Sequence, residues 1–507
     1  LPTAEKADIQ VFDEAFWQTG VRNSTLDVNW LNKMPPVPYR GRGGTEDDTE
    51  AGIDLYSAQQ RLQTAIKNWD GTTAPLLSAN LTPEIARWAE GLCHQRADSL
   101  DERLKNARSE DFGKVIAQWQ RHHGNARLEA SFWRILGKEL ERDRPLQAIR
   151  IISGDYGNQV EFNWRSDLKA KEAWTLVMDA TATVEVIEPY LPGIEVVNVT
   201  AAAPHQRIVQ ITDEQYGKSA IAPDIEKDDA AATKRKENRI NEVAAVLEVA
   251  RRVHKSVGVI TYKSTREALD ARSALDGLIH GHYGDIAGKD GFRDVDALFT
   301  FGRTEPTPFA VEALARGLFY DSDTPLTFSE TGSYVEADDA HWTKDGQHML
   351  ATRRAHSDPR IDAVRRQIVT ANLMQSDRTR GVQRAPDRPV TWYVVTNEPL
   401  PIPVDELWTN ADLVPSKWQV AAARGLFTTN PKHAAALHPD LWPNAKAAIN
   451  DRDRNGWAEV DLTAYNEIYL IGSEVNLAMV RYKPEGAGQK PTYLLASDAN
   501  SARESLE

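Results

Sequence analysis

Two adjacent carboxylates, Asp13 and Glu14, follow a strand-like stretch at residues 8–12. Such a stretch predicts a short buried strand whose carboxyl end presents the acidic pair. Phosphoryl-transfer enzymes use one carboxylate in this position to hold Mg²⁺ and a second to activate the attacking group. We therefore expect Asp13 to organise Mg²⁺ and Glu14 to orient and deprotonate a water molecule. An acidic pair that ends an ordinary strand is the alternative.

Small and hydroxyl-bearing residues follow another strand-like stretch, residues 175–179, in the run Ala180-Thr181-Ala182-Thr183. Hydroxyl groups can both donate and accept hydrogen bonds. We expect Thr181 and Thr183 to connect the acidic pair to a bound nucleic acid. A simple turn after a strand is the alternative.

A glycine-rich stretch at residues 281–296 leads into a third strand-like segment at 296–301. Glycines allow a backbone to come close to phosphate groups or another ligand. We predict that Gly288 in this loop contacts a nucleotide. A surface loop without a ligand is the alternative.

Arginines are concentrated at residues 375–384, after a long helical pattern. Guanidinium groups at a helix end or turn can stabilise charge on a transferring γ-phosphoryl group. We predict that Arg378 and Arg380 act in catalysis and that Gln375 and Arg384 contact the nucleotide. A solvated basic surface has the same composition and is the alternative.

The order of these four stretches resembles that of the superfamily 2 helicases. The closest resemblance is to the XPD-like and DinG-like DNA helicases, which carry a large helical insertion between motifs II and III. Residues 13–16 stand at motif II, 180–183 at motif III, 281–306 at motif V and 375–384 at motif VI. Residues 378–405 are also similar to helicase-like regions of phage- and plasmid-associated replication proteins, some of which carry primase modules upstream.

This resemblance implies two RecA-like lobes that close on ATP and Mg²⁺ and couple hydrolysis to movement on single-stranded or forked DNA. The arginines of the second lobe would complete the site that Asp13 and Glu14 begin in the first. The sequence departs from the family pattern at Phe16, where Asp or His is usual, and at Asp377, where Gly is usual. The single cysteine, Cys93, excludes the four-cysteine iron–sulphur cluster of the XPD-like branch within this sequence.

The phosphate-binding loop that should precede these motifs is not found, because no segment fits G-x-x-x-x-G-K-[ST]. Gly217-Lys218-Ser219 is the one Gly-Lys-Ser run, but Thr212 stands where the first glycine should be. This run also follows the motif III stretch. We therefore expect the phosphate-binding loop, with the rest of its lobe or a primase module, upstream of Leu1.

Aromatic and basic side chains near the ends of predicted strands are candidates for contacts with single-stranded DNA, through stacking and phosphate binding. For the two tyrosines core packing is the alternative, and for the histidine it is a structural hydrogen bond. The candidates are Tyr262, Lys263, His282, Tyr283 and Arg303.

The elements that must position these residues predict an α/β protein. The region before residue 145 is largely helical in pattern, whereas later segments alternate strands and helices, as in a mostly parallel sheet covered on both faces. We assign residues 1–50 and 145–185 to an incomplete first RecA-like lobe, 51–144 to a helical insertion, 186–400 to a second lobe and 401–507 to a small accessory domain.

The 507 residues are enough for several domains, and their net charge is −14. This charge argues against a generally basic nucleic-acid coat, but not against a local basic channel. No stretch approaches the roughly 18 continuous apolar residues that span a bilayer. The lone cysteine fits a reducing compartment, so we expect a cytoplasmic protein that does not enter membranes.

Two other functions fit the same residues. One is a catalytically inactive RecA-like module that binds nucleic acid or assembles a replication or mobile-element complex. The other is a metabolic α/β enzyme whose acidic pair and arginines bind a phosphorylated substrate. DNA-stimulated ATP hydrolysis would distinguish the motor from both.

Overall fold

The computed structural model describes most of the chain, and contacts divide it into two compact units. Unit 1 comprises Leu1–Val196, Pro306–Val335 and Ala355–Gln367, and unit 2 comprises Val197–Glu305, Glu336–Arg354 and Ile368–Glu507. Residues 306–335 and 355–367, which we expected in the second lobe, therefore belong to unit 1. The described residues are 8–13, 16–35, 37–38, 47–123, 125–142, 144–154, 157–168, 173–179, 181–199, 202–224, 226–286, 291–377, 379, 388–455, 467–471, 473–483, 492–498, 500 and 503.

Helices fill the region of unit 1 in which the sequence predicts them. Local signals fix their starts: the Thr82 hydroxyl accepts from the Ile85 N–H at 3.3 Å, and Pro83 occupies the first helical position of α4. The Asn125 side chain caps α6 in the same way. The helices are α2 (Thr49–Lys67), α3 (Ala74–Ser78), α4 (Pro83–Lys105), α5 (Phe112–His123) and α6 (Ala126–Leu140), with the 3₁₀ turn η3 (Ser109–Asp111).

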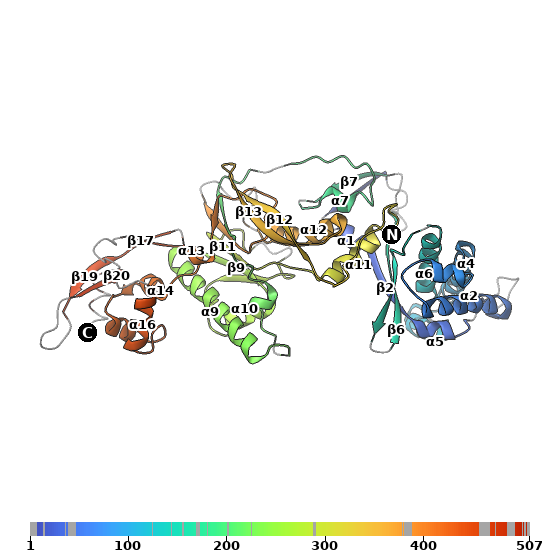
Figure 1. The fold of residues 1–507 in the computed structure, drawn as a ribbon, viewed down its shortest axis with the longest axis horizontal. Helices are drawn as coiled ribbons and strands as arrows, with labels where there is room; N and C mark the ends of the chain where they lie inside the picture. Colours follow the sequence, from blue (N-terminus) through green and yellow to red (C-terminus); the bar gives the residue numbers. More distant parts are fainter. Residues whose placement is uncertain are drawn as a thin grey trace. The chain divides into compact units, whose positions relative to one another are not determined.

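Figure 1 shows β2 and β6 beside these helices, in one of the three sheets formed by the described residues of unit 1. An antiparallel sheet in the order β2-β6-β5 shares its core with the helices, since the rings of Phe132 in α6 and Phe162 in β6 are 5.5 Å apart. The helical region is therefore packed on a sheet. A separate parallel pair, β1-β7, sets Asp13 opposite Met178. The strands are β1 (Ile9–Asp13), β2 (Val21–Asp27), β5 (Ile149–Gly154), β6 (Gly157–Arg165) and β7 (Trp174–Met178), with the short pair β3 (Val37–Pro38) and β4 (Asp47–Asp48).

Short helices complete unit 1. Buried polar contacts hold its later segments in place: the His356 ring lies 3.1 Å from Glu312 Oε1, and the Arg316 guanidinium donates to the Gln147 carbonyl at 2.9 Å. The elements are α1 (Phe16–Gly20), η2 (Val28–Asn32), α7 (Val184–Ile187) and α11 (Pro308–Leu318), and α12 (Pro359–Ser376) begins here.

Unit 2 is built on a six-stranded sheet in the order β10-β9-β11-β14-β8-β15, in which every neighbouring pair is parallel. This confirms the α/β class and the parallel sheet. Residues 194–198 form no strand, and most of their side chains are exposed. The strands are β8 (Gln206–Ile211), β9 (Val257–Thr261), β10 (Ile279–His282), β11 (Ala297–Phe301), β14 (Val390–Val395) and β15 (Glu406–Trp408).

Both faces of this sheet are buried, as its apolar strands require. Alternate side chains serve the two faces: Phe299 joins the core beneath α9, whereas Leu298 joins the core with Leu373 of α12. Figure 1 shows α9 and α10 beside β9 and β11. The helices here are α8 (Lys218–Ile221), α9 (Ala230–Val253) and α10 (Lys263–Asp270), and β12 (Val335–Trp342) pairs with β13 (His348–Ala355).

The predicted boundary at residue 400 falls inside unit 2. Strand β15 belongs to the sheet, and Phe427 and Trp442 belong to the same core cluster as Phe299. Beyond β15 lie α13 (Asn410–Leu413), α14 (Lys417–Ala423), α15 (Pro431–Leu437), α16 (Ala445–Asn455), β16 (Leu426–Phe427), β17 (Glu467–Leu470), β18 (Ser473–Asn476), β19 (Ala478–Tyr482) and β20 (Thr492–Ala496).

Candidate functional site

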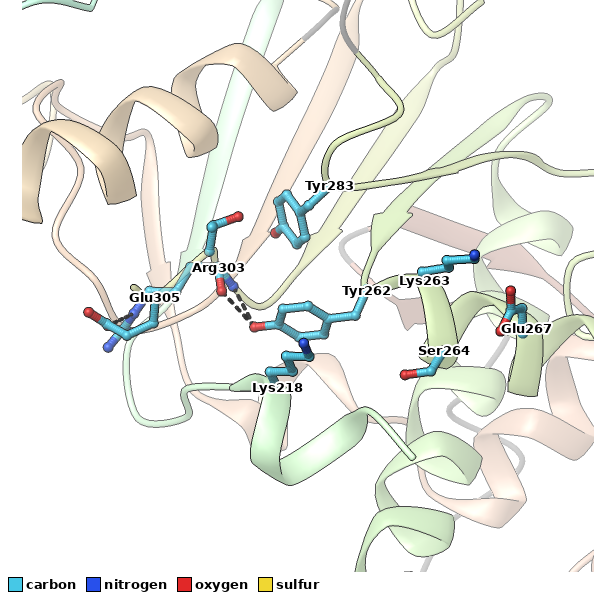
Figure 2. A pocket seen from close by; sticks show the side chains of 9 residues that line it. Lys218, Tyr262, Lys263, Ser264, Glu267, Tyr283, Arg303 and Glu305 are labelled. Atoms are coloured by element: carbon cyan, nitrogen blue, oxygen red, sulfur yellow. Dashed lines mark hydrogen bonds and ion pairs between the residues drawn. The ribbon is translucent and has the colours of Figure 1, made fainter. Parts of the chain in front are cut away.

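A pocket of about 510 Å³ lies in unit 2 beyond the carboxyl ends of three neighbouring strands, β10, β9 and β11. Figure 2 shows its walls, which come from segments that follow β8, β9, β10 and β11. The lining residues are Lys218, Tyr262, Lys263, Ser264, Glu267, Tyr283, Arg303, Thr304 and Glu305.

The topology of the sheet explains why a pocket forms here. Strand β9 continues through α10 to β10 at one edge of the sheet, whereas β11 continues towards β14 on its other side. The connections that leave β9 and β11 therefore diverge at adjacent strands. In open α/β sheets, such a divergence at the carboxyl ends is where ligands bind.

The two lysines give the pocket a local positive charge. Lys218 is the first residue of α8 and Lys263 is the first residue of α10, and both side chains are exposed. Within the described residues, the ammonium group of neither lysine has a hydrogen-bond or ion-pair partner. Both groups are therefore available to an anion.

The amino end of α10 adds hydrogen-bond donors. Tyr262 occupies the N-cap position and supplies no side-chain cap, so the first N–H groups of α10 have no partner from that side chain. The helix dipole also favours negative charge here. Ser264, in the first turn, adds a hydroxyl to the lining. The arrangement suits an anion with several oxygen acceptors, such as a phosphate group.

Two tyrosines form a rigid wall of the pocket. The Tyr262 hydroxyl donates to the Arg303 carbonyl at 2.7 Å and accepts from the Arg303 N–H at 3.0 Å, and the Tyr283 hydroxyl donates to the Gly302 carbonyl at 2.7 Å. The two rings lie 5.5 Å apart at an angle of 53°. Burial raises the pKa of Tyr262 to about 12 and the pKa of Tyr283 well above its ordinary value. Both side chains therefore stay neutral and are held by hydrogen bonds, which fits the alternative of core packing.

Arg303 lines the pocket, but its charge is already paired. The side chain is 4% exposed, its Nε donates to Glu305 at 2.9 Å, and its Nη1 lies 3.4 Å from the buried carboxylate of Glu398. Nη1 also donates to Asn397 Oδ1 at 3.0 Å. The guanidinium thus connects the segment after β11 to the segment after β14. We expected Arg303 to contact DNA, but its paired side chain forms part of the pocket wall.

The contacts of His282 fit the alternative of a structural hydrogen bond. Its Nδ1 lies 2.8 Å from the Tyr283 carbonyl and its Nε2 lies 3.9 Å from Asp285, and it is not among the lining residues. Of the seven residues predicted to contact nucleic acid, all of them described, Lys263 alone combines pocket lining with a charge that has no partner among the described residues.

Sequence reasoning missed Lys218. We set aside its Gly-Lys-Ser run because the first glycine of a phosphate-binding loop is replaced by Thr212. In the structure Gly217 is the N-cap of α8, a helix of four residues. Lys218 nevertheless lies beside the carboxyl end of the sheet. Its position after the predicted strand β8 could have identified it as a candidate for ligand binding.

The predicted threonines lie in a turn of unit 1 just after β7. Asp179 Oδ1 accepts from the Thr181 N–H at 2.8 Å and from the Thr181 hydroxyl at 2.9 Å. The Thr183 N–H donates to Gln367 Oε1 at 2.9 Å. Because Asp13 lies opposite Met178, the parallel pair places Asp13 beside the end of β7, just before Asp179.

The remaining predicted site residues are only partly covered by the structure. Asp13 is exposed at the end of β1, and Gln375 is half-buried in the last turn of α12. Among the described residues, no group of three or more His, Cys, Asp or Glu side chains is placed to hold a metal ion. Glu14, Gly288, Arg378, Arg380 and Arg384 lie outside the described residues.

Two described neighbours of the predicted arginines, Asp377 and Thr379, are bonded at the amino end of β8. The Gln206 amide, at the amino end of β8, donates to Asp377 Oδ1 at 2.7 Å and to the Thr379 hydroxyl at 3.0 Å. The His205 ring lies 3.1 Å from the Thr379 carbonyl. Asp377 and Thr379 therefore lie at the amino end of the sheet, whereas the pocket lies at the carboxyl ends of its strands.

No model of a protein family, no curated protein and no solved structure matches the chain. Among the residues that the structure describes, no helix combines the length and the apolar character needed to cross a membrane.

Proposed function

We propose that the chain is the nucleic-acid-gripping portion of an ATP-dependent DNA helicase or translocase, and that the pocket of unit 2 holds the phosphate backbone of a single strand. The observation that carries the proposal is the pair of unpaired lysines at the diverging carboxyl ends of β9 and β11. The fully parallel sheet supports a RecA-like lobe, and the order of motifs supports a motor of the superfamily 2 type.

Electrostatics favour a local grip over general attraction. The net charge of −14 repels nucleic acid at long range, so binding must come from a confined cationic site. In the pocket the Arg303 guanidinium pairs with Glu305 at 2.9 Å, and the two lysines outweigh the remaining lining carboxylate, Glu267, which leaves a net charge of +1. Binding through phosphates should weaken as salt rises, with a slope of about 0.7 for each contact to a single strand.

ATP and Mg²⁺ enter the proposal through the resemblance. Of the expected ligands, the described residues supply the exposed carboxylate of Asp13, and the neighbouring Asp179 carboxylate is already bonded to Thr181. These residues do not make up a complete nucleotide site. The spatial separation of the Asp377 segment from the pocket supports separate sites for nucleotide and nucleic acid.

A second candidate function is an assembly module without its own hydrolysis. The parallel pair β1-β7 favours it, because Trp174 and Leu176 of β7 are exposed on the same face as Ile9 and Val11 of β1. Parallel sheets are normally covered on both faces, so this face suits contact with another polypeptide.

The experiment that tests the proposed function measures binding of a fluorescent oligo(dT) to the chain by anisotropy at several salt concentrations. We expect the double variant Lys218→Ala, Lys263→Ala to bind at least about tenfold more weakly, and the salt slope to fall by about 1.4 if each lysine contacts one phosphate. The matched control is Lys255→Ala. Lys255 is also an exposed lysine, but it precedes β9 at the amino edge. Equal losses in both variants, or no binding by the unmodified chain, would refute the proposal.

A further inference from the structure

Unit 2 contains a β-hairpin that the sequence did not predict. Its strands are β12 and β13, and residues 336–354 belong to unit 2. Most of its side chains are exposed, yet it contains Trp342, His348 and Leu350. Trp342 is 52% exposed and Leu350 is 81% exposed. Large apolar side chains are usually covered, so their display on this hairpin calls for a reason.

One face of the hairpin is firmly anchored. His341 is 2% exposed, and its Nδ1 lies 3.2 Å from Gln210 Oε1. The Gln210 amide nitrogen donates to the carbonyls of Thr396 and Glu398, so its oxygen must accept and His341 Nδ1 must donate. This contact fixes β12 on the sheet beside β8.

The backbone on either side of His341 is fixed as well. The Val404 N–H donates to the Trp342 carbonyl at 2.8 Å, and the Lys344 N–H donates to the Val404 carbonyl at 2.8 Å. The Lys344 ammonium also donates to Asp405 at 2.7 Å. Trp342 is therefore held in place by its own main chain while its ring remains half-exposed.

The opposite face of the hairpin carries an aromatic pair. Side chains alternate along a strand, so Trp342 points away from the face that buries His341. The rings of Trp342 and His348 lie 5.0 Å apart at 34°. Leu350 and Arg354 follow His348 at alternate positions on the same strand. Within the described residues, no ion pair or hydrogen bond engages the guanidinium of Arg354.

We propose that Trp342 and His348 form a stacking platform for a base of the single strand whose backbone the pocket grips. This inference rests on the proposed function. A flat, half-exposed indole beside an imidazole offers a surface on which any base can stack. The anchored backbone positions the ring before binding, so little conformational entropy is lost when a base stacks.

The geometry of the sheet sets a length requirement. The hairpin is anchored beside β8 through Gln210, whereas the nearest strand that the pocket adjoins is β11, two positions away in the sheet. Strands lie about 4.8 Å apart, so about 10 Å of sheet separates the two sites. A stacked strand advances by about 3.4 Å along its axis for each nucleotide. A dinucleotide is therefore too short to occupy both sites, whereas a longer oligonucleotide can.

The test compares Trp342→Ala with Trp342→Phe in binding to a dinucleotide and to an oligo(dT) long enough to span both sites. We expect Trp342→Ala to weaken binding of the long strand by roughly tenfold, the order found when one base loses an aromatic partner. The salt slope should stay unchanged, because no phosphate contact is removed. Trp342→Phe should retain most of the affinity, and dinucleotide binding should not change. The matched control is Trp88→Ala, which removes a tryptophan that is 44% exposed on α4.

The outcomes separate the two proposals. If the unmodified chain does not bind the strand, the proposed function fails and the platform fails with it. If binding depends on Lys218 and Lys263 but Trp342→Ala behaves like Trp88→Ala, the platform is refuted and the proposed function stands. If Trp342→Ala and Leu350→Ser instead reduce self-association in sedimentation experiments and leave DNA binding intact, the face is a protein contact and the platform is refuted.

Discussion

At the scale of single residues, Gly302 is the position on which the pocket wall depends. Its φ is +81°, and an added Cβ would lie 2.5 Å from the Tyr216 carbonyl oxygen and 2.6 Å from the Tyr262 hydroxyl. This residue therefore permits the contact between the Tyr262 hydroxyl and the Arg303 backbone. Both backbone strain and a steric clash oppose any larger side chain.

We predict that Gly302→Ala lowers the free energy of unfolding by roughly 3 kcal/mol in urea titrations. The control is Gly284→Ala, because Gly284 has a φ of +88° but an added Cβ would meet nothing within 4 Å. This control should lose about 1 kcal/mol through backbone strain alone. Equal losses in the two variants would show that the clash with Tyr262 does not matter.

At the scale of elements, protonation of one histidine should loosen the hairpin β12-β13. Burial lowers the pKa of His341 from its ordinary value of 6.5 to about 4. The folded state therefore favours the neutral ring, and between these two pH values the unfolded chain binds more protons. The contribution of His341 to stability is complete above pH 6.5 and is lost as the pH falls towards 4.

We predict that urea unfolding monitored between pH 7 and pH 4 shows this loss, at most about 3 kcal/mol. His341→Asn removes the titrating ring, so its stability should fall less steeply over the same range. The comparison between the two slopes isolates His341 from the other groups that titrate there. Parallel slopes in the variant and the unmodified chain would contradict the prediction.

The elements that sequence patterns predict well are those whose cause is local. Strands β8, β9, β11 and β14 are apolar runs buried on both faces, and α4 begins with a cap and a proline. The hairpin β12-β13 was missed because its exposed, polar strands depend on contacts such as that between His341 and Gln210. Residues 194–198 have an apolar composition typical of a strand, but among the described residues no strand pairs with them.

The residues of the candidate site likewise include some that the sequence predicts and others that it does not. Lys263 was predictable, because the residue after a buried parallel strand lies at the edge where ligands bind. The paired charge of Arg303 was not, since Glu398 lies far from it in the sequence and meets it through the order of the strands. Lys218 likewise follows β8, which is three positions from β9 in the sheet. Fold topology, which no local pattern specifies, decides which charges remain available.

At the scale of the whole molecule, the pair β1-β7 exposes an apolar face of a kind that is usually buried inside a compact unit. Two parallel strands expose a continuous apolar row, and in the described residues neither strand has a second neighbour. Such a face favours association with another polypeptide. The residues and their exposed fractions are Ile9 66%, Val11 52%, Trp174 84%, Leu176 53% and Met178 52%.

We predict that the chain self-associates through this face, because burial of the row removes apolar surface from water, at about 25 cal/mol per Å². Trp174→Asn with Leu176→Asn should reduce the concentration-dependent rise in sedimentation coefficient and the binding of an apolar dye. Trp88→Asn, on α4, is the control for loss of an exposed tryptophan. Since the altered side chains point to solvent, urea unfolding should change by no more than about 0.5 kcal/mol. A chain that sediments identically with and without the double substitution would show that this face takes no part in association, and it would remove the support for the assembly-module function.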